Sequence, residues 1–301
     1  MGDSFKQILK LSSMVLVVAA VPGCIDPAGG EDGDVSEATS ELSIAGGATW
    51  GTTGNNGPLA QLGPTSSQTC FLSGVSGDFV GNPGLWGQPG SFLPASAEVF
   101  PQNGTWFIRT KAGIGPGVLA RVTCINVPYN PNLEFSWSDN LTSTGIALAP
   151  NRHCFLRSVW ATGGLSGSVL GTRTGIQITK RANEFDMNDS AVENIGGDFG
   201  YGGGTAVCVD VPTTAAWGFT LTGPSSGSTT ITLRNSFPNG TPVPVANVGC
   251  FMTGITGRWV SPSPDPQGWN DGAFLIGDPS VSVNWQMTAS NGRTGIASCI
   301  E

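Results

Sequence analysis

The chain has 301 residues, of which 11% are charged, and 21 acidic against 13 basic residues give a formal net charge of −8. The charged fraction is less than half of what is usual in a soluble globular protein. The basic residues are scattered and form no stripe that could follow a phosphate backbone, so the composition argues against nucleic acid as a partner.

Residues 1–23 are predicted to be an export signal. Two lysines, Lys6 and Lys10, precede an apolar run at 14–21 that is too short to span a membrane. The sequence Val21-Pro22-Gly23-Cys24 then resembles the lipobox of bacterial lipoproteins. This resemblance implies that Cys24 is diacylated and becomes the mature N-terminus, although Pro22 departs from the usual small or β-branched residue. The alternative is an ordinary signal peptide that ends near a cysteine.

The segment that follows, 24–45, is predicted to be an acidic tether. It carries six acidic residues, no Lys or Arg and no aromatic residue, so it cannot bury enough apolar surface to offset its backbone entropy. Removing residues 1–45 leaves 14 acidic and 11 basic residues, so the rest of the chain is nearly neutral. Ile25 replaces the Asp that retains many lipoproteins in the inner membrane, which by the same resemblance implies the outer membrane or cell surface. A secreted soluble protein is the alternative.

Six of the seven cysteines mark three tandem repeats of about 80–95 residues, which we place at 46–128, 129–212 and 213–301. Each repeat opens with Cys-Phe-Leu or Cys-Phe-Met and ends with a second cysteine about fifty residues later. One opening and one closing cysteine per repeat predict the disulfides Cys70–Cys124, Cys154–Cys208 and Cys250–Cys299. The alternative is free thiols or a metal site, but the chain has no Cys-x-x-Cys pair and one histidine, so no metal or cofactor is expected.

The residue usage predicts an all-β fold. The 45 Gly and 21 Pro residues leave no window after residue 45 that is long enough for a stable helix without breakers. Short runs rich in β-branched and aromatic residues predict strands at 105–110, 118–127, 175–180, 229–233, 280–288 and 295–300. Each repeat is therefore expected to form a small disulfide-closed sandwich or barrel-like unit. The sequence leaves open whether the units are separate beads or pack around a pseudo-threefold axis.

Repeats one and three share the opening Cys-Phe-[Leu/Met]-[Ser/Thr]-Gly-[Val/Ile]-[Ser/Thr]-Gly-x-aromatic, which begins at Cys70 and at Cys250. We expect both of its glycines to occupy tight reversals of the chain. This opening resembles repeats in bacterial secreted proteins and in the receptor-binding tips of pili and tails, a resemblance that carries no assigned activity. Repeat two has diverged most, with Arg157 to Trp160 in place of the glycine turn.

Seven tryptophans fall into three groups by position. Trp50, Trp137 and Trp217 each precede an opening cysteine and are predicted to be equivalent core residues, and Trp106 and Trp285 lie in apolar strands. Two others, Trp86 and Trp269, stand in glycine-rich loops, the second followed by Asn270 and Asp271. A loop tryptophan with polar neighbours can stack on a sugar ring while those neighbours bond its hydroxyls. The competing interpretation is that each ring anchors its loop onto its own domain.

The sequence offers little catalytic chemistry. His153 is expected to lie at the surface or at a strand edge, since no Gly-x-Ser-x-Gly elbow accompanies it. Asp186, Asp189 and Glu193 could form a hydrolase pair or a calcium loop, but a solvated polar loop is the simpler interpretation. We therefore expect a non-enzymatic lipoprotein with an adhesive, binding or structural role, with glycans or cell-surface molecules as partners. A secreted polysaccharide-active or other hydrolase is the alternative.

Overall fold

The computed structural model describes residues 44–52, 60–77, 79, 95–112, 117–138, 145–161, 175–189, 202–213, 215–235, 240–257, 259, 272–278 and 280–301. The described part of the chain is all-β, with one 3-10 turn at Pro131–Leu133. The predicted signal peptide and nearly all of the predicted tether, including Cys24, lie outside the described residues.

Each repeat contributes six strands. Repeat one forms β1 (Ile44–Thr52), β2 (Ala60–Pro64), β3 (Thr69–Gly77), β4 (Ala95–Gln102), β5 (Thr105–Ala112) and β6 (Val118–Ile125). Repeat two forms β7 (Glu134–Ser138), β8 (Ile146–Ala147), β9 (Arg152–Ala161), β10 (Gly175–Lys180), β11 (Glu184–Asp189) and β12 (Gly202–Asp210). Repeat three forms β13 (Ala216–Thr222), β14 (Ser228–Thr232), β15 (Gly249–Gly257), β16 (Gly272–Ile276), β17 (Gln286–Ser290) and β18 (Arg293–Ile300).

Five of the six predicted strand runs overlap β5, β6, β10, β14 and β18 closely. The sixth, predicted at 280–288, begins too early, because β17 starts only at Gln286. The residues before it form a turn in which Asp278 accepts hydrogen bonds from the backbone of Ser280, Val281 and Ser282. The alternating pattern Ser-Val-Ser-Val at 280–283 therefore predicts a strand wrongly, because hydrogen bonds to Asp278 fold this segment into a turn.

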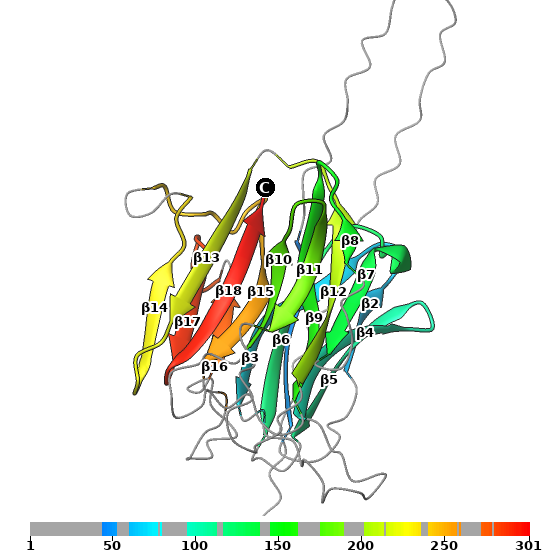
Figure 1. Cartoon of the computed structure of the whole chain (residues 1–301). Helices are drawn as coiled ribbons and strands as arrows, with labels where there is room; N and C mark the ends of the chain where they lie inside the picture. Colours follow the sequence, from blue (N-terminus) through cyan, green and yellow to red (C-terminus); the bar gives the residue numbers. More distant parts are fainter. Residues whose placement is uncertain are drawn as a thin grey trace, which may run out of the picture. The chain divides into compact units, whose positions relative to one another are not determined.

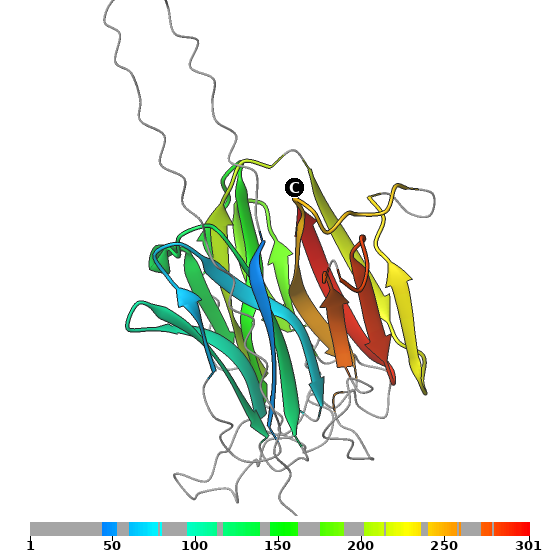
Figure 2. The same cartoon turned by 180° about the vertical axis from the view of Figure 1, so that it is seen from behind.

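The repeats are not separate units, because every sheet is shared by two of them (Figures 1 and 2). The three antiparallel sheets have the orders β1-β6-β3-β16-β17-β14, β13-β18-β15-β10-β11-β8 and β7-β12-β9-β4-β5-β2. In each sheet the first, sixth and third strands of one repeat are followed by the fourth, fifth and second strands of another. The exchange is cyclic: repeat three extends the sheet of repeat one, repeat two that of repeat three, and repeat one that of repeat two.

The third strands of the repeats, β3, β9 and β15, contact one another. Each presents the phenylalanine that follows its opening cysteine, and the rings of Phe71, Phe155 and Phe251 meet with centroids 4.7–5.0 Å apart. Valine and isoleucine side chains from the repeats complete this buried cluster. The question that the sequence left open is thus settled in favour of a shared pseudo-threefold axis, and we call these rings the phenylalanine trio.

The structure contains the three disulfides that the repeat predicts, Cys70–Cys124, Cys154–Cys208 and Cys250–Cys299. In each repeat the two cysteines lie directly opposite one another on the third and sixth strands. Their Cα atoms are 3.9–4.0 Å apart, the close approach of strand partners that do not exchange backbone hydrogen bonds. The disulfides therefore fix the register of the central strand pair in every repeat.

The prediction that both motif glycines occupy tight reversals is wrong for the first of them. Gly77 and Gly257 have φ of 102° and 104°, which only glycine adopts readily. Gly74 and Gly254 instead lie inside β3 and β15, next to a register irregularity. A Cβ atom on Gly74 would lie 2.3 Å from the Cβ of Phe274 on the neighbouring repeat's strand. This glycine is thus required where two repeats meet.

The tryptophans before the opening cysteines are not all equivalent. Trp50 and Trp137 oppose Ala120 and Gly204, which hold matching places on β6 and β12. Trp217 instead opposes Cys299, and Leu221 takes the matching place on β13. The prediction for Trp106 and Trp285 is confirmed, since both are buried and donate their indole N–H to the carbonyls of Gln68 and Val248, each at 2.8 Å.

Candidate functional site

The strand register defines two ends of the three-repeat body. At one, Ile44 and Thr69 pair with Ile125 beside a disulfide, and we call this the disulfide end. At the other, Thr52 and Gly77 pair with Val118, and we call it the loop end. The third-to-fourth strand connections of all three repeats, at 78–94, 162–174 and 258–271, start and finish at the loop end.

Strand pairing brings the ends of these connections together in a cyclic arrangement. Where the connection of repeat three ends, Gly272 pairs with Ser76, next to the start of the connection of repeat one. Ala95 likewise pairs with Ala161, and Gly175 with Thr256. Each connection therefore finishes beside the start of the next repeat's connection. Of the predicted ligand-binding residues, Trp86, Trp269, Asn270 and Asp271 all belong to these connections and lie outside the described residues.

Two described aromatic residues mark where the connections of repeats one and three begin. The rings of Phe79 and Trp259 are fully buried and meet edge to face, with centroids 5.7 Å apart. The Phe79 N–H also donates to the Trp259 carbonyl at 2.9 Å. The guanidinium of the buried Arg293 lies 5.4 Å from the centre of the Trp259 ring. Both residues end the opening motif, but no local sequence pattern predicts that they contact each other.

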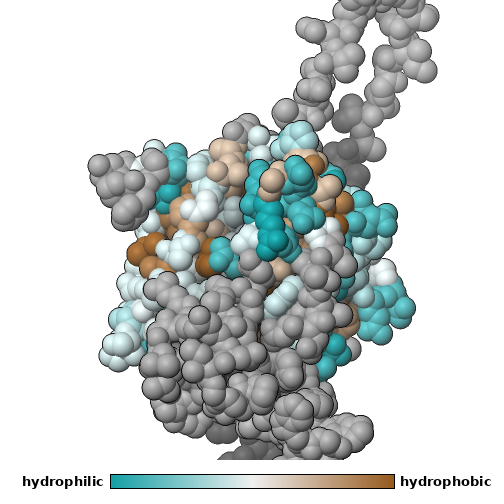
Figure 3. Space-filling view, in the orientation of Figure 1, coloured by the Kyte–Doolittle hydropathy of each residue, from teal (hydrophilic) through white to brown (hydrophobic). Residues whose placement is uncertain are grey.

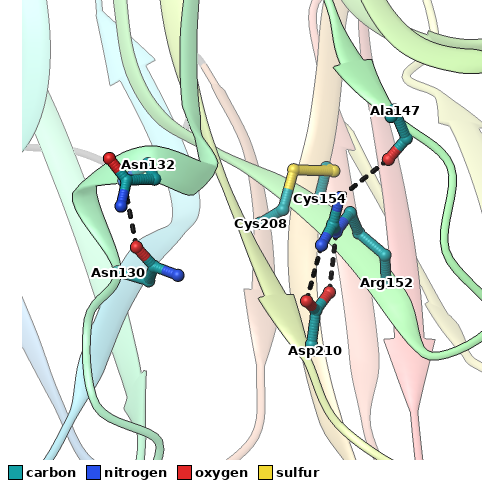
Figure 4. A network of polar contacts seen from close by, with 7 residues as sticks. All are labelled: Asn130, Asn132, Ala147, Arg152, Cys154, Cys208 and Asp210. Carbon is teal, nitrogen blue, oxygen red and sulfur yellow. Dashed lines mark hydrogen bonds and ion pairs between the residues drawn. A yellow bond between two sulfur atoms is a disulfide. The ribbon is translucent and has the colours of Figure 1, made fainter.

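The only histidine, His153, lies at the disulfide end, next to Cys154 in β9. Figure 4 shows the neighbouring Arg152 beside the bond between Cys154 and Cys208. Arg152 forms a two-pronged ion pair with Asp210, at 2.6 and 2.7 Å, and also donates to the Ala147 carbonyl. The adjacent His153 is half-buried and shares a 3.2 Å hydrogen bond with the Thr213 hydroxyl. Burial lowers the pKa of His153, helped by Lys180. These contacts hold the imidazole against the linker to repeat three.

The repeat-one equivalent supports a structural role for His153. Thr69 also precedes an opening cysteine, and its hydroxyl donates to the carbonyl of Val127, in the linker to repeat two, at 2.8 Å. The two side chains thus hold matching linkers in place. Sequence comparison alone did not reveal this, because Thr and His share no obvious chemistry until their partners are seen.

The structure describes the side chain of only one of the three carboxylates considered for hydrolysis. Asp186 is buried and its carboxylate pairs with Arg181 at 2.8 Å. Asp189 ends β11, whereas Glu193 lies outside the described residues. Within the described ranges no three His, Cys, Asp or Glu side chains gather in a way that could hold a metal ion.

A polar cluster that sequence reasoning missed lies between repeats one and two. Arg157 makes two hydrogen bonds to Glu134, at 2.6 and 2.9 Å, and a third to the Val99 carbonyl. The Tyr129 hydroxyl donates to the same carboxylate at 2.7 Å, and burial with this contact raises the pKa of Tyr129. The ring of Tyr129 packs edge to face on Trp106. The cluster joins β4 of repeat one to β7 and β9 of repeat two, so its hydrogen bonds link the two repeats.

Comparison with protein-family models gives no match, and a search of curated proteins finds no similar sequence. Among the described residues, no helix has the length and apolar character needed to cross a lipid bilayer. The class that the structure defines is an all-β protein of three interlocked, disulfide-bonded repeats.

Proposed function

We propose that this chain is an exported surface protein that binds its partner, without catalysis, through the loop end. The observation that carries the proposal is that the described body begins at the end opposite the third-to-fourth strand connections. Strand β1 begins with Ile44 at the disulfide end, whereas the third-to-fourth strand connections of all three repeats leave from the loop end. A rigid body that presents several loops at one end and is held at the other is suited to recognition.

Lipid attachment at Cys24 would complete this arrangement. The lipobox-like sequence supports it, and about twenty residues separate Cys24 from Ile44. An extended chain of that length reaches roughly 70 Å, enough to carry the body clear of a membrane surface. The intact mass of the exported protein tests the proposal: we expect a chain that begins at a lipidated Cys24. An unmodified N-terminus at any other residue would contradict it.

A carbohydrate is the ligand class that the composition favours. The body is nearly neutral and its surface depends on uncharged polar residues, which suits hydroxyl-rich ligands. The connections of repeats one and three contain Trp86 and Trp269, and these connections begin side by side at the Phe79–Trp259 contact. Two aromatic rings near one another would act on one ligand, and a single stacked ring contributes only about 1–3 kcal/mol. Several copies on one surface would add avidity.

A glycan array on the full chain tests this proposal. We expect Trp86→Ala and Trp269→Ala each to weaken binding about tenfold or more, because roughly 1.4 kcal/mol corresponds to a factor of ten. Both variants should retain the melting temperature of the parent. Trp160→Ala serves as the control for the loss of a tryptophan, because Trp160 lies in strand β9 and not in a connection. This variant should bind the glycan like the parent. A blank array, two variants that lose stability but not binding, or hydrolysis of the bound glycan would each contradict the proposal.

A further inference from the structure

Six strands form the outer edges of the three sheets: β1, β2, β7, β8, β13 and β14. Natural proteins protect such edges with short strands, charges, prolines or bulges, because unpaired backbone groups invite another strand. Four of the six carry a device of this kind. Strand β8 has two residues, β2 ends at Pro64 after a register shift, β7 begins at the ion-paired Glu134, and β1 has a register shift after Ile44.

Strand β13 carries none of these devices. It pairs with β18 without a register shift over its whole length, from Ala216 opposite Ile300 to Thr222 opposite Thr294. The strand contains no proline and no charged residue, and the chain is free of charge from Val211 to Leu233. The other edge of the same repeat, β14, is also uncharged. Repeat three therefore presents an unprotected side.

The inward side chains of β13 are incompletely covered. Trp217, Phe219 and Leu221 pack against the main core, yet all three remain partly exposed. Phe135 occupies the place in β7 that Phe219 occupies in β13, opposite the equivalent alanine of the sixth strand, and it is 2% exposed. The phenylalanine at this position is thus buried in repeat two and partly exposed in repeat three.

The neighbouring surface is also apolar. Among the described residues, the exposed large hydrophobic side chains are Ile231 in β14 and Val281 and Val283 in the segment before β17. In Figure 3, brown areas lie on the left of the view, over the strands that Figure 1 labels β13 and β14. Exposed apolar side chains in the same repeat as an open strand edge favour association at this side of the molecule.

We propose that β13 pairs with β13 of a second copy, antiparallel and centred on Phe219. In that register Phe219 faces its counterpart and Trp217 faces Leu221, so the strand is complementary to itself. The pairing would cover the partly exposed inward side chains of both copies, and it would place no two charged residues opposite each other. It would also satisfy the backbone groups of both edges by extending the six-stranded sheet across the dimer. A second copy of this chain can therefore cover the apolar side chains and pair the backbone groups of β13 without a strand from any other protein.

Antiparallel pairing of β13 fixes the relative direction of the two copies. Strand β13 runs from the disulfide end, at Ala216, to the loop end, at Thr222. Antiparallel pairing therefore directs the loop ends of the two copies away from each other. If the chain is lipid-anchored as proposed above, this arrangement suits copies anchored in two facing membranes, which the dimer would link to each other.

Sedimentation of the full chain carrying Cys24→Ser, from micromolar to near-millimolar concentration, tests the pairing without a lipid. We expect a concentration-dependent dimer whose dissociation constant rises at least 100-fold with Gly218→Lys and Thr220→Lys together. These substitutions place like charges opposite each other in the proposed register. A Cβ on Gly218 would meet no atom within 4 Å, so the fold should tolerate the change, as an unaltered melting temperature would show.

The matched control adds two lysines to the other edge of the repeat, with Ser228→Lys and Thr232→Lys on β14, both exposed positions. This control should dimerise like the parent chain. Dimer formation should also slow the amide hydrogen exchange of residues 216–222. A parent that stays monomeric at every concentration would overturn the proposal, as would dimerisation lost in the β14 control and retained in the β13 variant. Dimerisation in solution requires neither acylation of Cys24 nor glycan binding. The sedimentation experiment can therefore fail while the proposed function holds, and the reverse is also true.

Discussion

Replacing Phe155 with Ala is expected to lower the free energy of unfolding by about 3–5 kcal/mol, the usual cost of truncating a buried phenylalanine. Phe155 is 1% exposed, and its ring lies 5.0 Å from that of Phe71 and 4.7 Å from that of Phe251. Its removal leaves a cavity where three repeats meet, and the third strands that surround it cannot close inward without shifting the sheets that they anchor. Chemical denaturation followed by tryptophan fluorescence measures the loss.

Phe100→Ala provides the matched control. Phe100 stacks on Phe107 with ring centroids 6.1 Å apart, beneath the guanidinium of Arg109, and it is only half-buried. We expect this truncation to cost about 1 kcal/mol, since most of its surroundings can be replaced by water. Equal losses in the two variants would mean that the phenylalanine trio is not a core that holds the repeats together.

The disulfide pairing and the all-β class followed from the sequence because both depend on local pattern. Cys70 and Cys124 recur with their neighbours in the other repeats, and self-similarity of that kind reports which residues are equivalent. It does not report which copy of a strand is the partner. The fourth strand of a repeat could pair with its own third strand or with that of another repeat, and the two possibilities have the same sequence pattern.

The wrong predictions for Gly74 and Trp217 concern contacts between strands, which a local sequence pattern does not report. Gly74 was expected at a turn, but its neighbour is Phe274, which is 200 residues away in the chain. For Trp217 a usable signal existed. It lies 33 residues before Cys250, whereas Trp50 and Trp137 lie 20 and 17 residues before Cys70 and Cys154. The first pair of spacings is similar and the third is not, so the sequence already set Trp217 apart from the other two.

The predicted ligand-binding residues lie outside the described residues, so the structure describes only the surroundings of this site. Trp86 and Trp269 were chosen because glycine-rich loops are normally exposed. The structure describes the strands that flank both loops and shows that the loops start side by side, through Phe79 and Trp259. That proximity arises from the cyclic exchange of strands, which no local pattern encodes. Only the sheet order shows that the two loops begin beside each other.

Removal of the third disulfide, by Cys250→Ala with Cys299→Ala, is expected to destabilise the entire body and not repeat three alone. Opening a covalent loop of this length, with 49 residues of separation, costs about 4 kcal/mol in the chain-entropy model. If repeat three unfolds, β16, β17 and β14 leave the sheet that they share with repeat one, and β15 leaves its partner β10 of repeat two. The variant should therefore unfold in one transition at lower denaturant concentration.

Hydrogen exchange locates the effect. We expect the amides of β3 in repeat one, which pairs directly with β16, to lose protection together with those of β15. Alanine is preferred over serine here because both cysteines are fully buried, and a hydroxyl would add its own desolvation cost. The Cys70–Cys124 pair should remain oxidised, as intact mass would show. If β3 kept its full protection while repeat three exchanged freely, the repeats would behave as independent beads, and the shared sheets could not be what holds this protein together.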